Sequence, residues 1–491
     1  MHPDPTLTAL ERDAERDAAL PFLDLVAGYL VRMRAGDGPV SSPLTTDQIA
    51  ERFREPLPLG GRPLTDVVAR LETDVLGDAN RLVHPMYMGH QVSAPLPAAV
   101  WTEMVIAALN QSVAVAEMSP SGTALETRVI RWMTERIGWD GARAGGTFTS
   151  GGTEATFTAL LAARAAALPD AWDEGVGANP PAIVCGEHAH YSTTRAAAEL
   201  GLGVKRAIAV PSRDWKMDPA ALRDTLDRLA DAGTPVMAVV ATAGSTATGS
   251  FDDLEAIGEL CERRGLWLHV DGAHGASALL SERHRPRLRG VQYARSVAWD
   301  AHKMMLMPLA AGMLLVRDER DLERAFAQRA PYLFHGEGEG EGEGEGGRAR
   351  GWDQGTRSFL CSRRLDALKV WVALQRYGAR GIAALYDHLA ATACALHEAI
   401  VARSDFEAMH VPESNILCFR WIGDGTRDDE TLDTLNRELR ERYNRSGRGW
   451  ITTTVLGGRR VLRVTIMNPR TTRSHVLRLL DGLAEVGGTV G

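Results

Sequence analysis

The sequence contains little cysteine and no long apolar run. Five cysteines occur among the 491 residues, and none of them forms a CxxC pair, which argues against a disulfide framework and against a zinc ribbon. No stretch reaches the roughly 18 apolar residues of a membrane span. The first 22 residues mix charges where a signal peptide has an apolar core. We therefore expect a cytoplasmic protein without a membrane anchor.

The chain also lacks a cluster of basic residues. Its formal net charge is -8, and its arginines are scattered along the sequence. This distribution argues against nucleic acid and anionic lipid as partners and favours a small molecule. With 45% hydrophobic and 24% charged residues, the composition is globular, and the length allows two or three domains.

Hydrophobic periodicity divides the chain into three parts. Residues 1–97 show apolar positions at helical spacing and predict an N-terminal helical segment. Residues 98–375 predict a large α/β domain, and residues 376–491 predict a small α+β domain in which strands and helices follow one another.

The α/β assignment depends on short apolar runs that are separated by helical patterns. Continuous apolar strands that alternate with helices are typical of a mainly parallel sheet covered on both faces. The predicted strands are AIVCG (182–186), VMAVVAT (236–242), LWLHVD (266–271), SVAWD (296–300) and AGMLLVRD (311–318).

Polar residues directly follow several of these strands. In open α/β sheets, ligands bind beyond the carboxyl ends of the strands, so these residues are candidates for one site. The four stretches are TSGGTEATF (149–157), HAHYS (188–192), VDGAHG (270–275) and DAHK (300–303).

Each stretch alone allows more than one interpretation. The glycine turn before Thr153 fits a phosphate site at a helix N-terminus or a plain turn with a threonine cap. Asp271 and Lys303 fit a buried ion pair. The histidines could instead bind a metal, although their spacing matches no standard zinc motif. Taken together, the stretches supply what pyridoxal phosphate (PLP) needs: an anion cradle, a lysine, a carboxylate and a flat partner for the ring.

In combination, these motifs resemble the group II PLP-dependent amino acid decarboxylases. The resemblance also includes HPMYMGHQ (84–91) and RVTIMNP (463–469), and it spans nearly the whole chain. It implies the PLP-dependent transferase fold of type I, a carboxy-lyase that releases an amine and CO2, and a homodimer with active sites at the interface. The glutamate and 2,4-diaminobutyrate branch matches better than the aromatic branch, so we expect 2,4-diaminobutyrate or an acidic amino acid as substrate.

The resemblance also implies roles for individual residues. Lys303 would bind the cofactor aldehyde, and Asp271 would hold the proton on the pyridine nitrogen. His190 would stack on one face of the ring, and Ala273 would leave room at the other. The phosphate and its surroundings would be contacted by Gly152, Thr153, Thr246 and His302. The substrate would be bound by His90, Gln91 and Arg463.

One departure from the family pattern concerns the mobile loop, which normally carries a tyrosine that protonates Cα. Residues 333–376 contain no tyrosine, and Trp352 stands near the expected place. The repeat HGEGEGEGEGEGG begins at His335, within a loop predicted at 335–352, and its glycines and like charges predict a mobile segment. His335 or a histidine of the pocket could supply the proton.

Three alternatives remain open from the sequence. Relatives that lack the tyrosine can divert to oxidative deamination, which gives an aldehyde. An aminotransferase of the same fold would give a keto acid without CO2. A non-catalytic homologue would not need Lys303, Asp271 and His190 together.

Overall fold

The computed structural model describes residues 5–326 and 352–489, which form two compact units. Unit 1 contains residues 1–94, 392–411 and 417–491, and unit 2 contains residues 95–391 and 412–416. The first and last parts of the sequence therefore share a unit, although the sequence predicts them as separate segments. Among the described residues, no helix has both the length and the apolar character needed to cross a bilayer.

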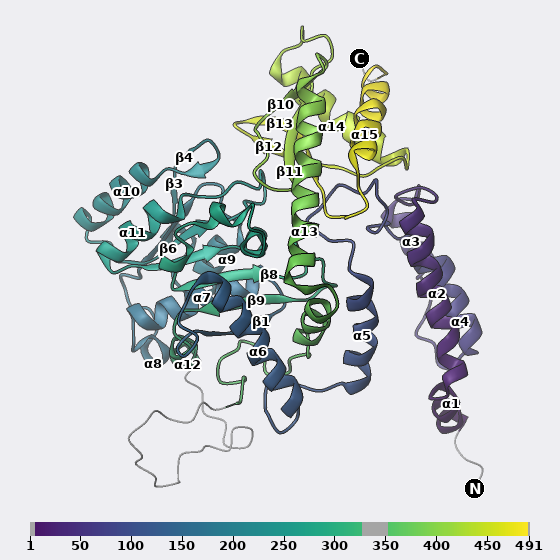
Figure 1. Ribbon diagram of the computed structural model, residues 1–491, viewed down its shortest axis with the longest axis horizontal. Coiled ribbons are helices and arrows are strands. Elements are labelled where there is room, and N and C mark those ends of the chain that lie inside the picture. The colour runs from purple at the N-terminus through teal and green to yellow at the C-terminus, as the bar shows by residue number, and fades with distance from the viewer. Residues whose placement is uncertain (1–4, 327–351, 490–491) are drawn as a thin grey trace. The chain divides into compact units, whose positions relative to one another are not determined.

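Unit 2 is built around a seven-stranded sheet in the described part of the chain (Figure 1). Neighbouring strands are parallel except for β9, which runs antiparallel to both β8 and β1. The spatial order is β1 (Gly145–Thr149), β9 (Gly312–Val316), β8 (Ser296–Asp300), β7 (Trp267–Asp271), β6 (Val236–Thr242), β2 (Ala182–Gly186) and β3 (Ala207–Val210).

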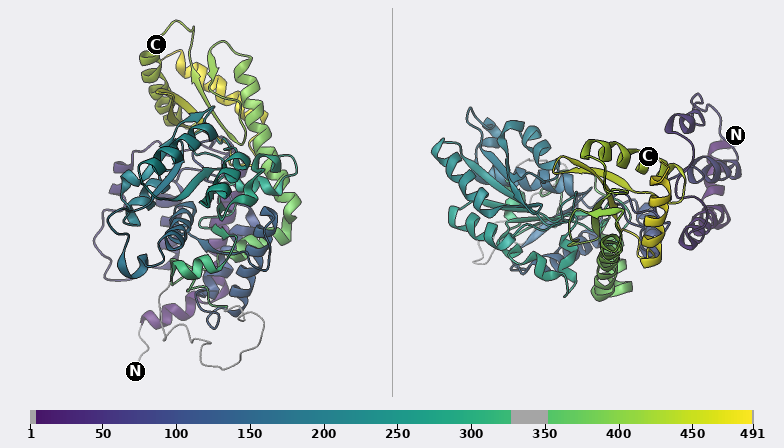
Figure 2. Two further views of the ribbon diagram at one scale, coloured as in Figure 1. Left: turned by 90° about the vertical axis from the view of Figure 1, so that its left-hand side faces the viewer. Right: turned by 90° about the horizontal axis from the view of Figure 1, so that it is seen from above.

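Both faces of this sheet are covered, as the apolar strand sequences require. Every residue of β2, β7, β8 and β9 is buried, which is possible only when helices pack on both sides. Figure 2 shows these flanking helices. The α-helices of unit 2 up to residue 326 are α5 (Pro97–Leu109), α6 (Pro120–Ile137), α7 (Gly152–Ala167), α8 (Ala171–Glu174), α9 (Ser192–Glu199), α10 (Pro219–Asp231), α11 (Leu254–Arg264) and α12 (Arg320–Ala325). Of these, α6, α7, α9, α10 and α11 contact strands of the sheet.

Smaller elements connect the strands of unit 2. They are the hairpin β4 (Ser212–Arg213) and β5 (Lys216–Met217), and the 3-10 helices η2 (Val204–Arg206), η3 (Ala276–Leu280), η4 (Arg285–Leu288) and η5 (Val291–Tyr293). Helix α13 (Ala367–Val401) begins in unit 2 and ends in unit 1, and it is broken at Gly378, whose φ is 69°.

In unit 1, a four-stranded sheet packs with two helices. Its order is β10 (Phe406–Ala408), β11 (Ile416–Trp421), β13 (Arg459–Thr465) and β12 (Thr452–Leu456), and the helices are α14 (Asp429–Arg445) and α15 (Arg473–Gly487). The sequence predicts strands at residues 415–421, 450–456 and 460–467, and these ranges overlap β11, β12 and β13.

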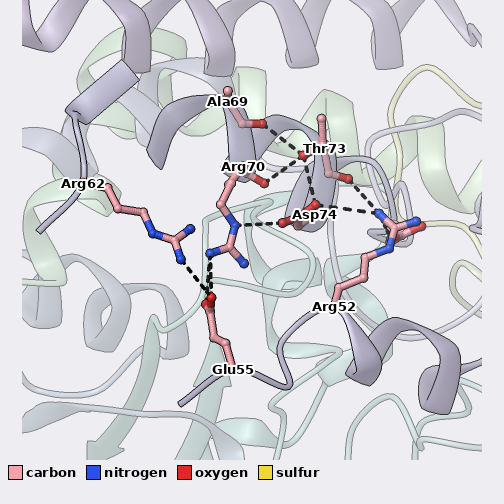
Figure 3. Close-up of polar contacts among 8 residues, drawn as sticks. Arg52, Glu55, Arg62, Ala69, Arg70, Thr73 and Asp74 are labelled. Atoms are coloured by element: carbon pink, nitrogen blue, oxygen red, sulfur yellow. Dashed lines mark hydrogen bonds and ion pairs between the residues drawn. The ribbon is translucent and has the colours of Figure 1, made fainter. Parts of the chain in front are cut away.

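The N-terminal helices of the same unit are α1 (Pro5–Asp13), α2 (Arg16–Ala35), α3 (Thr46–Glu51), α4 (Leu64–Arg70) and the π-helix η1 (Leu71–Leu76). Ion pairs tie the turn before α4 to this helix and to η1 (Figure 3). Glu55 pairs with Arg62 at 3.2 Å and with Arg70 at 2.9 Å, and Arg70 also pairs with Asp74 at 3.1 Å. Because these side chains are largely solvated, the network orients the turn more than it stabilises the fold.

Candidate active site

The carboxyl end of β8 carries the candidate lysine. Strand β8 ends at Asp300, and the chain turns directly into His302 and Lys303. Lys303 Nζ lies 3.0 Å from Asp300 Oδ2, and His302 Nε2 lies 3.4 Å from the same oxygen. The Asp300 side chain is 1% exposed, whereas that of Lys303 is 21% exposed. Lys303 therefore contacts a buried carboxylate, while part of its own side chain remains exposed to solvent.

Asp300 is an anion in this structure. Burial alone would raise the pKa of its carboxyl group, but the charge of Lys303 and the hydrogen bond from His302 outweigh that effect. The pKa consequently lies well below its ordinary value. The ionised Asp300 carboxylate therefore attracts the Lys303 ammonium group and keeps it beside the pocket.

The glycine turn after β1 lies against the same carboxylate. The Gly152 N–H, at the start of α7, donates to Asp300 Oδ2 at 3.0 Å. A Cβ on Gly152 would lie 2.8 Å from Ala273 Cβ, which is closer than side chains approach, so only glycine fits here. The turn after β1, the end of β7 and the end of β8 are thus brought together, as the sequence predicts.

Asp271 closes β7, next to β8 in the sheet. It is 9% exposed, and its Oδ1 accepts from the Ala273 N–H at 3.2 Å. His190 lies on the loop after β2, and burial lowers its pKa. The negative charge of Asp271 raises this pKa and so offsets part of the effect of burial. His190 is therefore neutral at neutral pH.

Hydrogen bonds identify which nitrogen carries the proton on each histidine. The Ser192 N–H donates to His190 Nδ1 at 3.3 Å, and the Ala311 N–H donates to His302 Nδ1 at 3.0 Å. Because Nδ1 accepts in both rings, the proton of each neutral ring resides on Nε2. For His302, this is the nitrogen that faces Asp300.

Two further predicted residues occupy different positions. Thr153 lies partly buried in the first turn of α7, next to Gly152. Thr246 is exposed in the turn after β6, where the Ser245 and Thr248 hydroxyl groups are 2.8 Å apart. Thr153 therefore has the better placed hydroxyl for an anion at the α7 N-terminus.

The predicted substrate residues all belong to unit 1. The segment that contains His90 and Gln91 runs beside β13, because the Thr465 N–H donates to Met88 O at 3.0 Å. Partial burial and then the charges of Arg463 and Arg440 lower the pKa of His90. Burial lowers the pKa of Arg463 itself, which is 6% exposed.

This cluster of unit 1 is rich in hydrogen-bond donors. In the described part of the chain, Gln91 Nε2 and Trp450 Nε1 are buried without an acceptor. Arg440 lies over the Trp450 ring, 5.5 Å from its centroid. Positive charge and open donors together suit a ligand with acceptor oxygens.

Asp300 is the residue that sequence reasoning missed. It closes an apolar strand as Asp271 does, and it stands three residues before Lys303. That repeated pattern, an aspartate at the end of a buried strand, was the available signal. Its burial at 1% and its contacts with Gly152, His302 and Lys303 show its place.

Three further predictions concern the loop at 335–352, His269 and metal binding by histidines. The predicted loop at 335–352, with His335, lies outside the described residues except for Trp352, which is 56% exposed. His269 is fully buried in β7, with its Nδ1 2.9 Å from Ser296 Oγ. The described residues hold no group of three His, Cys, Asp or Glu side chains arranged for a metal ion.

The residues at the carboxyl end of the sheet fit PLP. The close approach of Gly152 to Ala273 leaves a cradle without side chains at a helix N-terminus, where backbone N–H groups attract phosphate. Asp300 Oδ1 is buried and has no hydrogen-bond partner within residues 5–326 and 352–489. Lys303 and the Asp271 carboxyl group complete the groups that the cofactor requires.

Comparison with known proteins agrees with this fit. The family model described as the pyridoxal-dependent decarboxylase conserved domain matches residues 67–422. The chain is 34% identical over 432 residues to the L-2,4-diaminobutyrate decarboxylase of Rhizobium meliloti, covering 88% of this chain and 83% of that protein. It is 32% identical over 415 residues to the cysteine sulfinic acid decarboxylase of Rattus norvegicus, covering 82% of each.

A solved structure supports the fold assignment. The crystal structure of mouse CSAD in apo form matches with a TM-score of 0.87 and 28% identity, covering 96% of this chain and 99% of that chain. The predicted fold class, the mainly parallel α/β sheet of PLP-dependent transferase fold type I, is confirmed, and so are the predicted cofactor and reaction class. The chain belongs to the pyridoxal-dependent decarboxylase family and is a PLP-dependent amino acid carboxy-lyase.

Proposed function

We propose that the enzyme decarboxylates 2,4-diaminobutyrate or an acidic L-amino acid to the amine, with Lys303 as the residue that binds the cofactor aldehyde. The observation that carries this proposal is the contact of Lys303 Nζ with the buried Asp300, 3.0 Å apart, beside the glycine turn. When bound, PLP supplies an electron sink that stabilises the charge left at Cα after CO2 departs.

The roles of the remaining site residues follow from their contacts. Asp271, which is buried at the end of β7, would hold a proton on the pyridine nitrogen. His190 would lie flat on the ring, since a neutral imidazole stacks without adding charge. Asp300 would act as a positioning residue, because one of its oxygens holds both the Gly152 N–H and Lys303.

The choice of substrate involves the unit 1 cluster of His90, Gln91 and Arg463. Its charge favours a carboxylate-bearing group, which every amino acid has and which acidic amino acids have twice. The relatives named for diaminobutyrate and cysteine sulfinate each support one of the two substrate classes.

A second product is favoured by one specific observation. The chain has no tyrosine between residues 333 and 376, where the family places its proton donor. Without a donor for Cα, dissolved O2 would take up the two electrons left after CO2 departs, and with water the products would be an aldehyde, ammonia and hydrogen peroxide. A histidine that donates from the pocket would restore amine formation.

One experiment tests substrate and product together. The holoenzyme is incubated with a panel of L-amino acids, and CO2, amine, aldehyde and peroxide are measured in the same samples. Amine equal to CO2 supports the first proposal, and aldehyde with peroxide supports the second. A keto acid without CO2 would contradict both.

We also propose that the protein is a cytoplasmic homodimer whose N-terminal helices contribute to the interface. Helices α1 and α2 expose Leu7 at 59%, Leu10 at 60% and Val31 at 63%, and such exposed apolar side chains are suited to burial by a partner. Light scattering after size-exclusion chromatography would contradict this proposal if the holoenzyme elutes as a monomer at micromolar concentration.

A further inference from the structure

The turn of the β4–β5 hairpin in unit 2 has an unusual sequence for its backbone. Strands β4 and β5 pair directly, so Asp214 and Trp215 form a two-residue turn between them. Both residues have left-handed backbone conformations, with φ of 52° and 67°. Such a turn favours glycine at its second position, because a side chain there costs free energy, and most of all a bulky one. Trp215 is therefore an unfavourable residue for the backbone that it occupies.

The ring of Trp215 lies against His188. The two ring centroids are 5.6 Å apart, and the ring planes are inclined by 52°. Both side chains are partly buried. Contacts between aromatic rings at this separation are favourable. Since the turn itself disfavours tryptophan, the contact with His188 is the observation that accounts for this residue.

Hydrogen bonds attach the hairpin to its surroundings at both strands. At β4, the Ser212 N–H donates to Glu187 Oε1 at 2.7 Å. At β5, the Met217 N–H donates to Asp252 Oδ1 at 2.8 Å, and Asp252 Oδ2 accepts from the Thr242 N–H at the end of β6. The hairpin is therefore a fixed support for the side chain at its turn.

His188 belongs to the short loop between β2 and α9, and His190 stands two residues after it. The Ala189 N–H donates to Gly186 O at 2.9 Å, and Ala189 packs on the hydrophobic core. On the other side of the loop, His190 Nδ1 accepts from the Ser192 N–H. Because only one residue separates the two histidines, a displacement of His188 would also move His190.

We propose that Trp215 is a positioning residue, which holds His188 and thereby fixes the ring of His190 for stacking on the cofactor. This role of Trp215 rests on the proposed stacking of His190. A ring that is fixed in advance loses less conformational freedom when the cofactor binds, and it keeps the cofactor better aligned for the reaction. We therefore expect Trp215 to affect both PLP binding and turnover.

The first test replaces Trp215 with glycine. Trp215→Gly relieves the left-handed backbone and removes the ring contact, so the apoenzyme should unfold at nearly the temperature of the wild type. PLP should nevertheless bind about threefold more weakly, and turnover should fall about tenfold. The visible circular dichroism of the bound cofactor should weaken, because the ring beside it is less fixed. Titration of the apoenzyme with PLP, steady-state CO2 release and thermal unfolding measure these effects.

Two variants serve as controls. Trp215→Phe keeps an aromatic ring at the same place, so it should retain most of the PLP affinity and turnover. Asp214→Gly changes the other left-handed residue of the turn, which is exposed and has no ring, so it should behave as the wild type does. Unchanged PLP binding in Trp215→Gly would overturn the positioning role, and so would an equal loss in either control.

The second test removes the other ring of the contact. His188→Ala should weaken PLP binding as much as Trp215→Gly does, and the double variant should be no weaker, since both substitutions break one contact. Additive losses would show that the two rings act separately and would refute the positioning role. If Trp215→Gly does not fold, His188→Ala decides the matter, because unchanged PLP binding in that variant would refute the role by itself.

His190→Ala separates the role of Trp215 from the proposed role of His190. It should weaken PLP binding by about tenfold, because the stacking itself is lost. Unchanged binding in His190→Ala would refute the stacking and, with it, the role of Trp215. A loss in His190→Ala together with unchanged binding in Trp215→Gly would refute the positioning role of Trp215 alone.

Discussion

Asp300 and Asp252 are buried aspartates of the same α/β unit, yet their pKa values shift in opposite directions. Burial raises the pKa of Asp252 to about 6, and hydrogen bonds from the Thr242 and Met217 N–H groups at 2.7 and 2.8 Å offset this only in part. Burial acts on Asp300 in the same way, but the charge of Lys303 and the hydrogen bond from His302 reverse the result.

The difference shows what the active site adds to an ordinary buried carboxylate. Backbone donors satisfy the oxygens of Asp252 without supplying a full charge in contact with them. Asp300 has two cationic or protonated side chains within 3.4 Å of Oδ2. Contact with positive charge therefore decides whether the pKa of a buried carboxylate lies above or below its ordinary value.

The largest expected effect comes from removing the charge that distinguishes Asp300. Lys303→Ala should lower turnover by at least about 1,000-fold, or about 4 kcal/mol of barrier. It should also abolish the visible absorbance of the cofactor bound through the lysine. Steady-state CO2 release and absorbance spectra check this, and Lys205→Ala, at an exposed lysine, is the control. Retained absorbance in Lys303→Ala would exclude Lys303 as the attachment point.

Asp252→Asn should change how stability depends on pH. The folded pKa of about 6 exceeds the unfolded value of about 3.9, so protonation favours the folded state. The stabilisation is fully present below about pH 4 and is lost as the pH rises above about 6, a change on the order of 3 kcal/mol.

Urea unfolding at several pH values measures this effect. The free-energy difference between the wild type and Asp252→Asn should fall over the window given above. The same difference for Asp224→Asn, an exposed aspartate on α10, should stay nearly constant. Parallel pH profiles for the wild type and Asp252→Asn would contradict the raised pKa.

Asp300→Asn should show the opposite pH dependence. Asparagine can still accept from the Gly152 N–H, but it loses the charge that faces Lys303 and His302. The apo variant should be less stable at pH 7 by on the order of 2 kcal/mol. Because the folded pKa of Asp300 is lowered, this loss should shrink as the pH falls below about 4. A variant as stable as the wild type at pH 7 would show that the ion pair is energetically unimportant.

The smallest effect is expected in the solvated network of unit 1. Glu55→Gln removes the carboxylate that pairs with Arg62 and Arg70, yet the thermal midpoint should not change measurably, because solvent already screens these charges. Differential scanning calorimetry at low and high salt checks this. A marked loss of stability at low salt would show that this network contributes to the free energy of unfolding by an amount closer to that of the Asp300 ion pair.

Sequence reasoning located five strands of the seven-stranded sheet of unit 2 and missed β1 and β3. Strands β2, β6, β7, β8 and β9 coincide with continuous apolar runs, which is why they could be predicted. Strand β1 reads GGTFT, with one large apolar residue. Its strand identity comes from pairing with β9 and from burial, neither of which its own sequence encodes.

Candidate residues of the site were predictable to a similar degree. Asp271 ends a strand, and Gly152 and Lys303 follow strands within three residues, so the topology brings them to one edge of the sheet. Asp300 was missed because its residue type does not reveal which oxygen meets which partner. Contacts of that kind depend on how β1, β7 and β8 pack side by side.

The sequence by itself determined five strands of the large sheet, the residues that follow them, and the family to which the chain belongs. These properties follow from local patterns and short motifs. The tertiary structure alone decided that Asp300 is ionised while Asp252 holds its proton more tightly. Such outcomes depend on distances between residues far apart in the chain, and electrostatic and hydrogen-bond energies change steeply with those distances.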